Sequence, residues 1–242
     1  MIVYSNSCSF GAPQDHITYG EYVGNQLNAE FINKGIFGSC NRRIIRTTLR
    51  DLNELKSSNK DIVALIGLTF ISRTELWRED LDANSNDGHF HSLSIDHSSF
   101  SWKDGVNTEH KNVHEYIDDE VKGYYKEWLY HYNRESAMTN LLTDIVMLTG
   151  WLKNNNIKYL IFSNVDKLEG EEYIGYTSPF INSLRDSIDL DDNIIDLWNF
   201  SFGTYALENG LKPKDEDIFG KHGHPGKDAH ILFGKYLLGK LI

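Results

Sequence analysis

The feature that most constrains the fold of this chain is a regular alternation of short apolar runs with segments of helical periodicity. Apolar runs of the kind that are buried in a parallel sheet occupy residues 1–4, 61–67 and 157–165. Apolar side chains recur at helical spacing in residues 19–27, 42–58, 134–156 and 224–242. We therefore expect an α/β fold, a three-layer α/β/α sandwich with a central parallel sheet, in which residues 1–4, 62–66 and 159–162 form neighbouring strands.

The length of the chain favours a single domain. A chain of 242 residues can bury a substantial core, and we assign residues 1–242 to one domain. The alternating pattern weakens at about residues 76–134, which are rich in Ser, Asn, Asp, Gly and His. We interpret this stretch as an insertion or cap on the α/β domain.

The charge balance argues against a nucleic-acid partner. Asp and Glu number 35 against 24 Lys and Arg, giving a formal net charge of -11, whereas affinity for nucleic acid rests on clustered cations. The basic group of Arg42, Arg43 and Arg46 is interpreted as a solvated helix face or as partners for the acidic surplus. Arg73 and Glu75 are interpreted in the same way, as a structural pair.

The cysteines and the hydropathy bear on the cellular compartment of the protein and on whether it associates with a membrane. Cys8 and Cys40 form neither a disulfide framework nor a metal-binding CxxC pattern, so reduced thiols in a cytoplasmic protein are expected. We expect Cys8 to be a small buried hydrophobic residue. No stretch reaches the roughly 18 apolar residues of a membrane span, and no leader peptide is recognisable, so no membrane partner is expected.

Polar turns follow three of the expected strands at the edge where a parallel α/β sheet binds its ligands. These turns are residues 7–11, 38–41 and 67–73, and His224 precedes the last helix, from where it could reach the first turn. A hydroxyl beside an imidazole, with backbone N–H groups nearby, is what acyl transfer requires. Taken alone, Ser9 is better explained as a small residue in a strand-to-helix turn.

Four blocks of sequence stand in a fixed order along the chain: Ser7-Cys8-Ser9-Phe10, "NKGIFGSCNRRIIR", "GLTFISRTE" and Lys221-His222-Gly223-His224. In these blocks the chain resembles the SGNH hydrolases, or GDSL-like esterases, and it looks closest to a branch that reads Gly-Cys-Ser-Phe and is found in tailed phages. The resemblance implies an SGNH/flavodoxin-like sandwich and a serine esterase or deacylase that acts on a small acyl ester, including one on a carbohydrate, without a cofactor. If the chain is phage-encoded, it would act in the host cytoplasm or in the virion.

The resemblance also implies a role for individual residues. Ser9 corresponds to the nucleophile and His224 to its base, while the backbone of Ser9, Gly38 and the side chain of Thr69 would form an oxyanion hole. Lys221 stands where the family has its triad acid, so Asp217, beside Asp215 and Glu216, is the candidate that would orient His224. The remaining residues expected to line the site are Asn41, Arg73 and His222.

Three alternatives remain at this stage. The altered blocks also fit a protein that keeps the fold but has lost catalysis and serves as a binding or structural component. The spacing of Asp87, His89 and His91 could suit a metal, but we interpret them as part of a polar loop and assign no metal site. The aromatic side chains of the insertion would either stack on a sugar or pack within the cap; they are Trp102, Tyr116, Tyr124, Tyr125, Trp128 and Tyr130.

Overall fold

The computed structural model describes residues 1–71, 73–77, 90–94, 102–103, 106–107, 123–124, 127–128, 130–165, 179, 183, 191–211 and 224–242. Their elements, in chain order, are β1 (Ile2–Ser7), α1 (Tyr19–Gln26), β2 (Glu30–Asn33), α2 (Asn41–Leu55), the 3-10 turn η1 (Lys56–Ser58), β3 (Ile62–Leu68), β4 (Arg73–Trp77), β5 (Phe90–Ser94), β6 (Trp102–Lys103), β7 (Val106–Asn107), α4 (Arg134–Asn154), β8 (Lys158–Ser163), α6 (Phe202–Glu208) and α7 (Lys227–Leu241).

The central sheet is parallel throughout and has the strand order β2-β1-β3-β8. Ile2 lies opposite Ile62, and Ala64 lies opposite Tyr159, so the three predicted strands are neighbours, as expected. Beyond β8, a single parallel bridge pairs Ile161 of β8 with Ile194, so a fifth segment of the chain lies along that edge of the sheet. This is the doubly wound order in which the connection switches side between β1 and β3, and such sheets bind ligands at the carboxyl ends of those strands.

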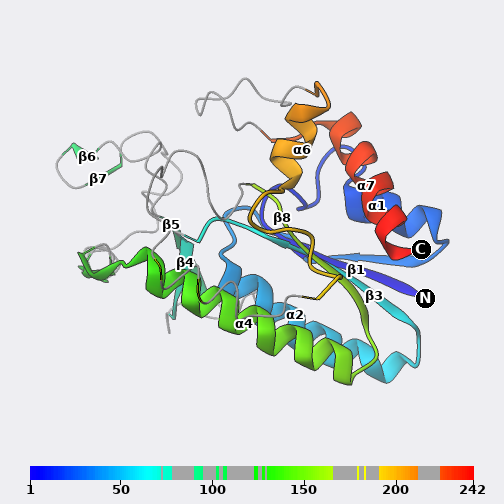
Figure 1. Cartoon of the computed structure of the whole chain (residues 1–242), viewed down its shortest axis with the longest axis horizontal. Coiled ribbons are helices and arrows are strands. Elements are labelled where there is room, and N and C mark those ends of the chain that lie inside the picture. The colour runs from blue at the N-terminus through cyan, green and yellow to red at the C-terminus, as the bar shows by residue number, and fades with distance from the viewer. Residues whose placement is uncertain are drawn as a thin grey trace.

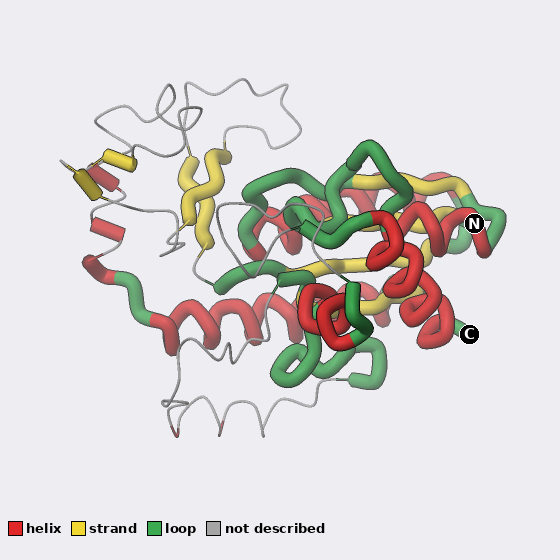
Figure 2. Tube along the Cα trace, turned by 90° about the horizontal axis from the view of Figure 1, so that it is seen from above, coloured by secondary structure: helices red, strands yellow, loops and turns green. Residues whose placement is uncertain are grey.

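Helices cover both faces of the sheet, which confirms the three-layer prediction (Figure 1). On β3, side chains alternate between two cores: Ala64 and Ile66 face α2 and α4, whereas Val63 and Leu65 face α1, α6 and α7. Seen from above, the antiparallel pair of β4 and β5 lies apart from the central strands (Figure 2). This pair begins at Arg73, close to the predicted start of the insertion.

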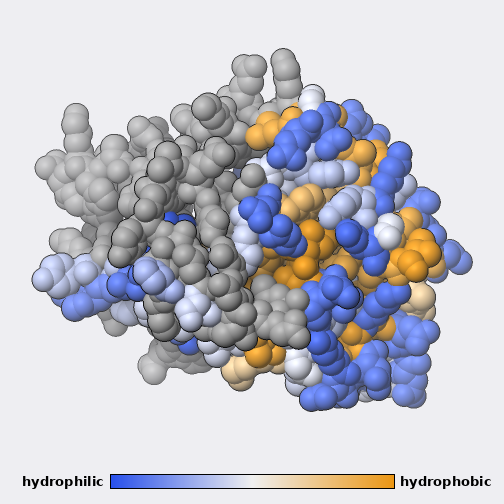
Figure 3. Space-filling model, viewed as in Figure 1, coloured by the Kyte–Doolittle hydropathy of each residue, from blue (hydrophilic) through white to orange (hydrophobic). Residues whose placement is uncertain are grey.

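The described surface mixes polar and apolar side chains. In the view of Figure 1, hydrophobic side chains gather near the middle of the described face and hydrophilic ones border them (Figure 3). Within the described residues, no helix is long and apolar enough to cross a membrane. Cys8 and Cys40 are both free and buried, as predicted.

A buried histidine joins α1 to α7. His230 is fully buried, and its Nδ1 accepts a hydrogen bond from the backbone N–H of Tyr19 at 3.2 Å. Its ring stacks on that of Tyr19, with centroids 5.7 Å apart, and lies 5.1 Å from the ring of His16. The pKa of His230 is lowered to about 3, chiefly by burial and also by the nearby His16 and His224, while a hydrogen bond with the Pro225 backbone acts in the opposite direction.

This burial predicts acid sensitivity. An unfolded histidine binds a proton below about pH 6.5, whereas native His230 does so only near pH 3, so the free energy of unfolding should decrease as the pH falls through this range. Urea unfolding at pH 7.5 and pH 5 should show this loss in the wild type and a smaller loss in His230→Asn. The exposed His131→Asn is the control and should keep the wild-type difference. An unchanged pH difference in His230→Asn would contradict the assignment.

Candidate active site

Ser9 lies in the turn that follows β1, at the carboxyl edge of the sheet. The backbone N–H groups of Gly11 and Ala12 both donate to the carbonyl of Cys8 at 3.1 Å, which folds the chain back directly after β1. Gln14 Nε2 donates to the carbonyl of Ser9 at 3.2 Å. Ser9 is 8% exposed, so a small part of its surface remains open beside this turn.

This turn is packed so tightly that it requires a glycine at position 11. A Cβ on Gly11 would lie 2.2 Å from the hydroxyl of Tyr19 and 2.3 Å from Ser7 Oγ. Both of those groups are fully buried, and Tyr19 is enclosed by aromatic rings of α6, β8 and α7, so neither can move aside at low cost. The close approach of Gly11 thus fixes the backbone two residues after Ser9.

Gly38 occupies a turn after β2. Its φ is +77°, a conformation that favours glycine, and a Cβ there would meet no atom within 4 Å. The N–H of Ser39 donates to the carbonyl of Ile36 at 3.2 Å, so the segment is a turn and not a helix. Gly38 is therefore in the left-handed conformation, and the space beside it is open.

Asn41 clamps the backbone of Thr69, which directly follows β3. Asn41 Oδ1 accepts from the Thr69 N–H at 2.7 Å, and Asn41 Nδ2 donates to the Thr69 carbonyl at 2.9 Å. These paired bonds join the first residue of α2 to the end of β3. They bring together two of the three turns that were predicted to share this edge.

The charged residues beyond Thr69 are paired differently from the prediction. Glu75 binds Arg46, with Arg46 Nε donating to Oε1 at 3.0 Å and Nη2 donating to Oε2 at 2.7 Å. Arg73 does not pair with Glu75; its Nη1 donates to Thr69 Oγ1 and to the Ser39 carbonyl, both at 3.3 Å. The expected Arg73–Glu75 pair was wrong, because both carboxylate oxygens of Glu75 accept from Arg46 of α2 instead.

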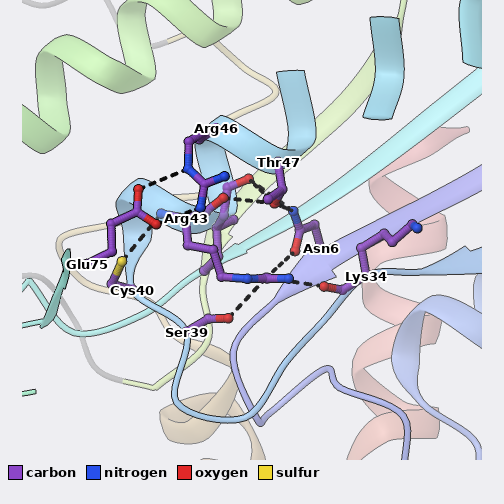
Figure 4. A network of polar contacts seen from close by, with 9 residues as sticks. Asn6, Lys34, Ser39, Cys40, Arg43, Arg46, Thr47 and Glu75 are labelled. Atoms are coloured by element: carbon purple, nitrogen blue, oxygen red, sulfur yellow. Dashed lines mark hydrogen bonds and ion pairs between the residues drawn. The ribbon is translucent and has the colours of Figure 1, made fainter. Parts of the chain in front are cut away.

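Arg43 was expected either on a solvated face or as a partner for acidic residues, and the solvated face was wrong, because Arg43 is 3% exposed. Its Nη1 donates to Ser39 Oγ at 3.1 Å, to the Lys34 carbonyl at 3.3 Å and to Asn6 Oδ1 at 3.4 Å (Figure 4). Asn6 Nδ2 in turn lies within hydrogen-bond distance of Thr47 Oγ1, at 2.8 Å. A guanidinium is buried here because neutral oxygens of β1 and of the turn after β2 surround it.

Sequence reasoning missed Asn6 and Arg43 as the residues that support this edge. The available signal was the helical spacing of Arg43, Thr47 and Asp51, which places polar side chains at four-residue intervals beside the apolar stripe of α2. All three of these residues are buried. A third missed residue, Asn164, follows β8 and packs over Gly67, where a Cβ would lie 2.2 Å from its Nδ2.

His224 lies beside the turns that carry Ser9 and Gly38. Its ring centroid is 5.5 Å from that of Phe10 and 6.1 Å from that of Phe37. Phe10 and Phe37 directly adjoin Ser9 and Gly38 in the chain. The last loop therefore brings an imidazole to the edge where β1 and β2 end. Asp217, His222, and Asp87 and His89 of the insertion lie outside the described residues.

The fold and this edge define an α/β/α protein with a serine, an imidazole and open backbone turns at the carboxyl ends of its parallel strands. The chain belongs to the family of unknown function DUF6071, whose model matches residues 11–242. No curated protein sequence matches the chain.

Solved structures with similar folds include several esterases. The acetyl xylan esterase AlAXEase is 17% identical with a TM-score of 0.47, and the match covers 100% of both chains. A catalytic mutant of Axe2, an acetylxylan esterase from Geobacillus stearothermophilus, is 12% identical with a TM-score of 0.42, over 99% of this chain and 93% of that one. An acetyl xylan esterase from Butyrivibrio proteoclasticus is 15% identical with a TM-score of 0.41, over 99% of this chain and 62% of that one. Similarity at this level does not establish a shared activity.

The buried hydrogen bonds of Arg43 give a prediction for stability. Arg43→Met would leave Asn6 Oδ1, the Lys34 carbonyl and Ser39 Oγ without this donor, and should lower the free energy of unfolding by about 2 to 4 kcal/mol. The adjacent Arg42 is exposed, so Arg42→Met should change it by less than about 0.5 kcal/mol. Urea denaturation of the two variants measures the difference, and equal effects would refute the role of Arg43.

Proposed function

We infer that this protein is a serine hydrolase of the SGNH type, an esterase or deacylase that acts on a small acyl ester, including one carried by a carbohydrate. The observation that carries this proposal is the position of His224, whose ring contacts the aromatic neighbours of both Ser9 and Gly38. Residues distant in the chain thereby supply a hydroxyl, an imidazole and an open backbone turn at one edge of the sheet.

In the proposed reaction Ser9 Oγ attacks the carbonyl carbon of the ester while His224 accepts the hydroxyl proton. The resulting tetrahedral intermediate collapses as His224 returns that proton to the leaving alcohol, which leaves the acyl group on Ser9. A water molecule, deprotonated by His224, then attacks the acyl-enzyme. The carboxylic acid departs and Ser9 recovers its proton.

The developing oxyanion would accept hydrogen bonds from the backbone N–H groups of Ser9 and Gly38 and from the hydroxyl of Thr69. Since Arg73 Nη1 donates to Thr69 Oγ1, the hydroxyl hydrogen of Thr69 does not point toward Arg73 and is available to another acceptor. Donation from a guanidinium also polarises the hydroxyl and strengthens it as a donor. Asn41 supports this role because it holds the Thr69 backbone at both its N–H and its carbonyl.

Two features favour a small acyl group on a sugar. Ser9 is nearly buried, so the space at its hydroxyl suits a short acyl chain better than a long one. Phe37 is 61% exposed beside His224 and presents an aromatic face on which a sugar ring can stack. The finer parts of the proposal are that Asp217 orients His224, that His222 lines the site, and that the chain comes from the phage branch and acts in the host cytoplasm or the virion.

The nucleophile and the base can be tested together. The wild type should hydrolyse a short-chain aryl ester or an acetylated sugar, and Ser9→Ala and His224→Ala should each lose turnover to a similar extent, because residues that act as a unit fail together. His131→Ala is the control, since that side chain is 71% exposed. Circular dichroism would verify that all variants are folded.

The alternative is a protein that keeps the fold but lacks catalysis, a binding or structural component. The burial of Thr69, which is 1% exposed, favours this alternative because an oxyanion donor must reach the substrate. Two results together would establish it: no turnover by the wild type above the Ser9→Ala background on any ester or acetylated sugar, and no labelling of Ser9 by a serine-reactive phosphonate.

A second test isolates the hydroxyl of Thr69. Thr69→Val keeps the shape of the side chain but removes the donor, and should lower kcat about a hundredfold to a thousandfold with little change in KM. Thr69→Ser keeps the hydroxyl and should retain most of the activity. Steady-state kinetics on one acetylated substrate compares the two, and equal losses in both variants would mean that packing, and not the hydroxyl, is responsible.

A further inference from the structure

Arg73 is a cation at the edge of the candidate active site that has no carboxylate partner among the described residues. Its Nη1 donates to Thr69 Oγ1 and to the Ser39 carbonyl. Its Nε is buried and has no hydrogen-bond partner among the described residues, and both of its hydrogen bonds to described residues are donated by Nη1 and not by Nη2. The edge of the guanidinium formed by Nε and Nη2 is therefore unused.

Arg46 provides an internal comparison, because the same edge of its guanidinium is filled. Its Nε and Nη2 donate to the two carboxylate oxygens of Glu75, at 3.0 and 2.7 Å. Glu75 lies only two residues from Arg73, but its side chain is 4% exposed and both of its oxygens already accept from Arg46. The nearest carboxylate in the chain is thus unavailable to Arg73.

The guanidinium of Arg73 is nevertheless held in place. Its central carbon lies 4.8 Å from the ring centroid of Phe70, in cation–π contact, and two hydrogen bonds fix Nη1. A buried N–H without an acceptor among the described residues is unfavourable. A guanidinium held in one orientation, with Nε and Nη2 not used by other acceptors, has the geometry that binds a carboxylate through two parallel hydrogen bonds.

We propose that Arg73 binds a carboxylate of the substrate, so that the site takes the acyl ester of an acidic sugar in preference to that of a neutral one. The proposal rests on the proposed function, since Arg73 contacts Thr69 and thereby lies next to the intended position of the ester carbonyl. The carboxylate would accept from Nε and Nη2, in the same arrangement that Glu75 makes with Arg46. Arg73 is then a specificity-determining residue.

Equilibrium binding tests the carboxylate site without relying on catalysis. Calorimetric titration of the wild type with glucuronate and with glucose should give a Kd at least about tenfold lower for glucuronate, as expected for a bidentate charged pair. Arg73→Gln should abolish this difference. Arg73→Lys keeps the charge without the fork and should retain only part of it. Arg50→Gln is the control. It removes a cation that pairs with Asp51 and lies nine residues along α2 from Asn41, and it should bind both sugars as the wild type does.

Kinetics then tests the link to the reaction. The wild type should favour an acetylated glucuronate over the matching acetylated glucose in kcat/KM by about tenfold or more, and Arg73→Gln should reduce that ratio to about one. Equal binding of glucuronate and glucose by the wild type, or an equal loss in Arg50→Gln, would overturn the carboxylate site. Selective, Arg73-dependent binding without turnover of any ester would uphold the carboxylate site while rejecting the proposed hydrolase. Melting temperatures of the variants separate a local loss from unfolding.

Discussion

The buried guanidinium of Arg43 is the interaction on which the carboxyl edge of the sheet depends. It lies in α2 but binds Asn6 of β1 and two residues of the turn after β2, so one side chain joins three segments. Asn6 adds bonds to Thr47 and Thr48 of the same helix. Because each of these acceptors is neutral, they stabilise the charge as dipoles that the fold holds in place, and a displacement of any one segment would weaken the others.

The contacts of Arg43 are the first in a series of contacts that positions the site residues. The start of α2 is fixed beside β1, which places Asn41 at the end of β3, and Asn41 then holds the backbone of Thr69. Arg73 is oriented by Thr69 and by Phe70, while Gly11 allows the turn after β1 to approach Tyr19. The turns of a parallel sheet are far apart in the chain, so polar contacts of this kind are what give the edge a defined shape.

The sequence alone was sufficient for the central architecture. Continuous apolar runs such as "DIVALIG" are typical of strands buried between two layers of helices, and the spacing of Ile44, Ile45, Leu49 and Leu52 defines one face of α2. Pairing between charges could not be obtained in this way, because it depends on which strand faces which helix. Arg43 and Arg46 are both arginines and lie one helical turn apart on α2, yet Arg43 donates to neutral oxygens whereas Arg46 pairs with Glu75 of β4.

For the candidate site, too, the sequence predicts some features and not others. Their place at the carboxyl ends of the strands follows from topology, which the order of the runs predicts. Which atoms are left unpaired at that edge, such as Nε of Arg73, depends on angles and distances that only the folded chain defines.

The packing of α7 against α1 has a consequence for biosynthesis. These helices come from opposite ends of the described chain, and together they cover the face of the sheet formed by Val3, Val63 and Leu65. During translation β1, β3 and α1 leave the ribosome long before α7, so this apolar face stays uncovered until the final segment emerges. His224, which immediately precedes α7, arrives in the same interval. A nascent chain of this protein would therefore be both prone to aggregation and without its candidate base until the last helix docks.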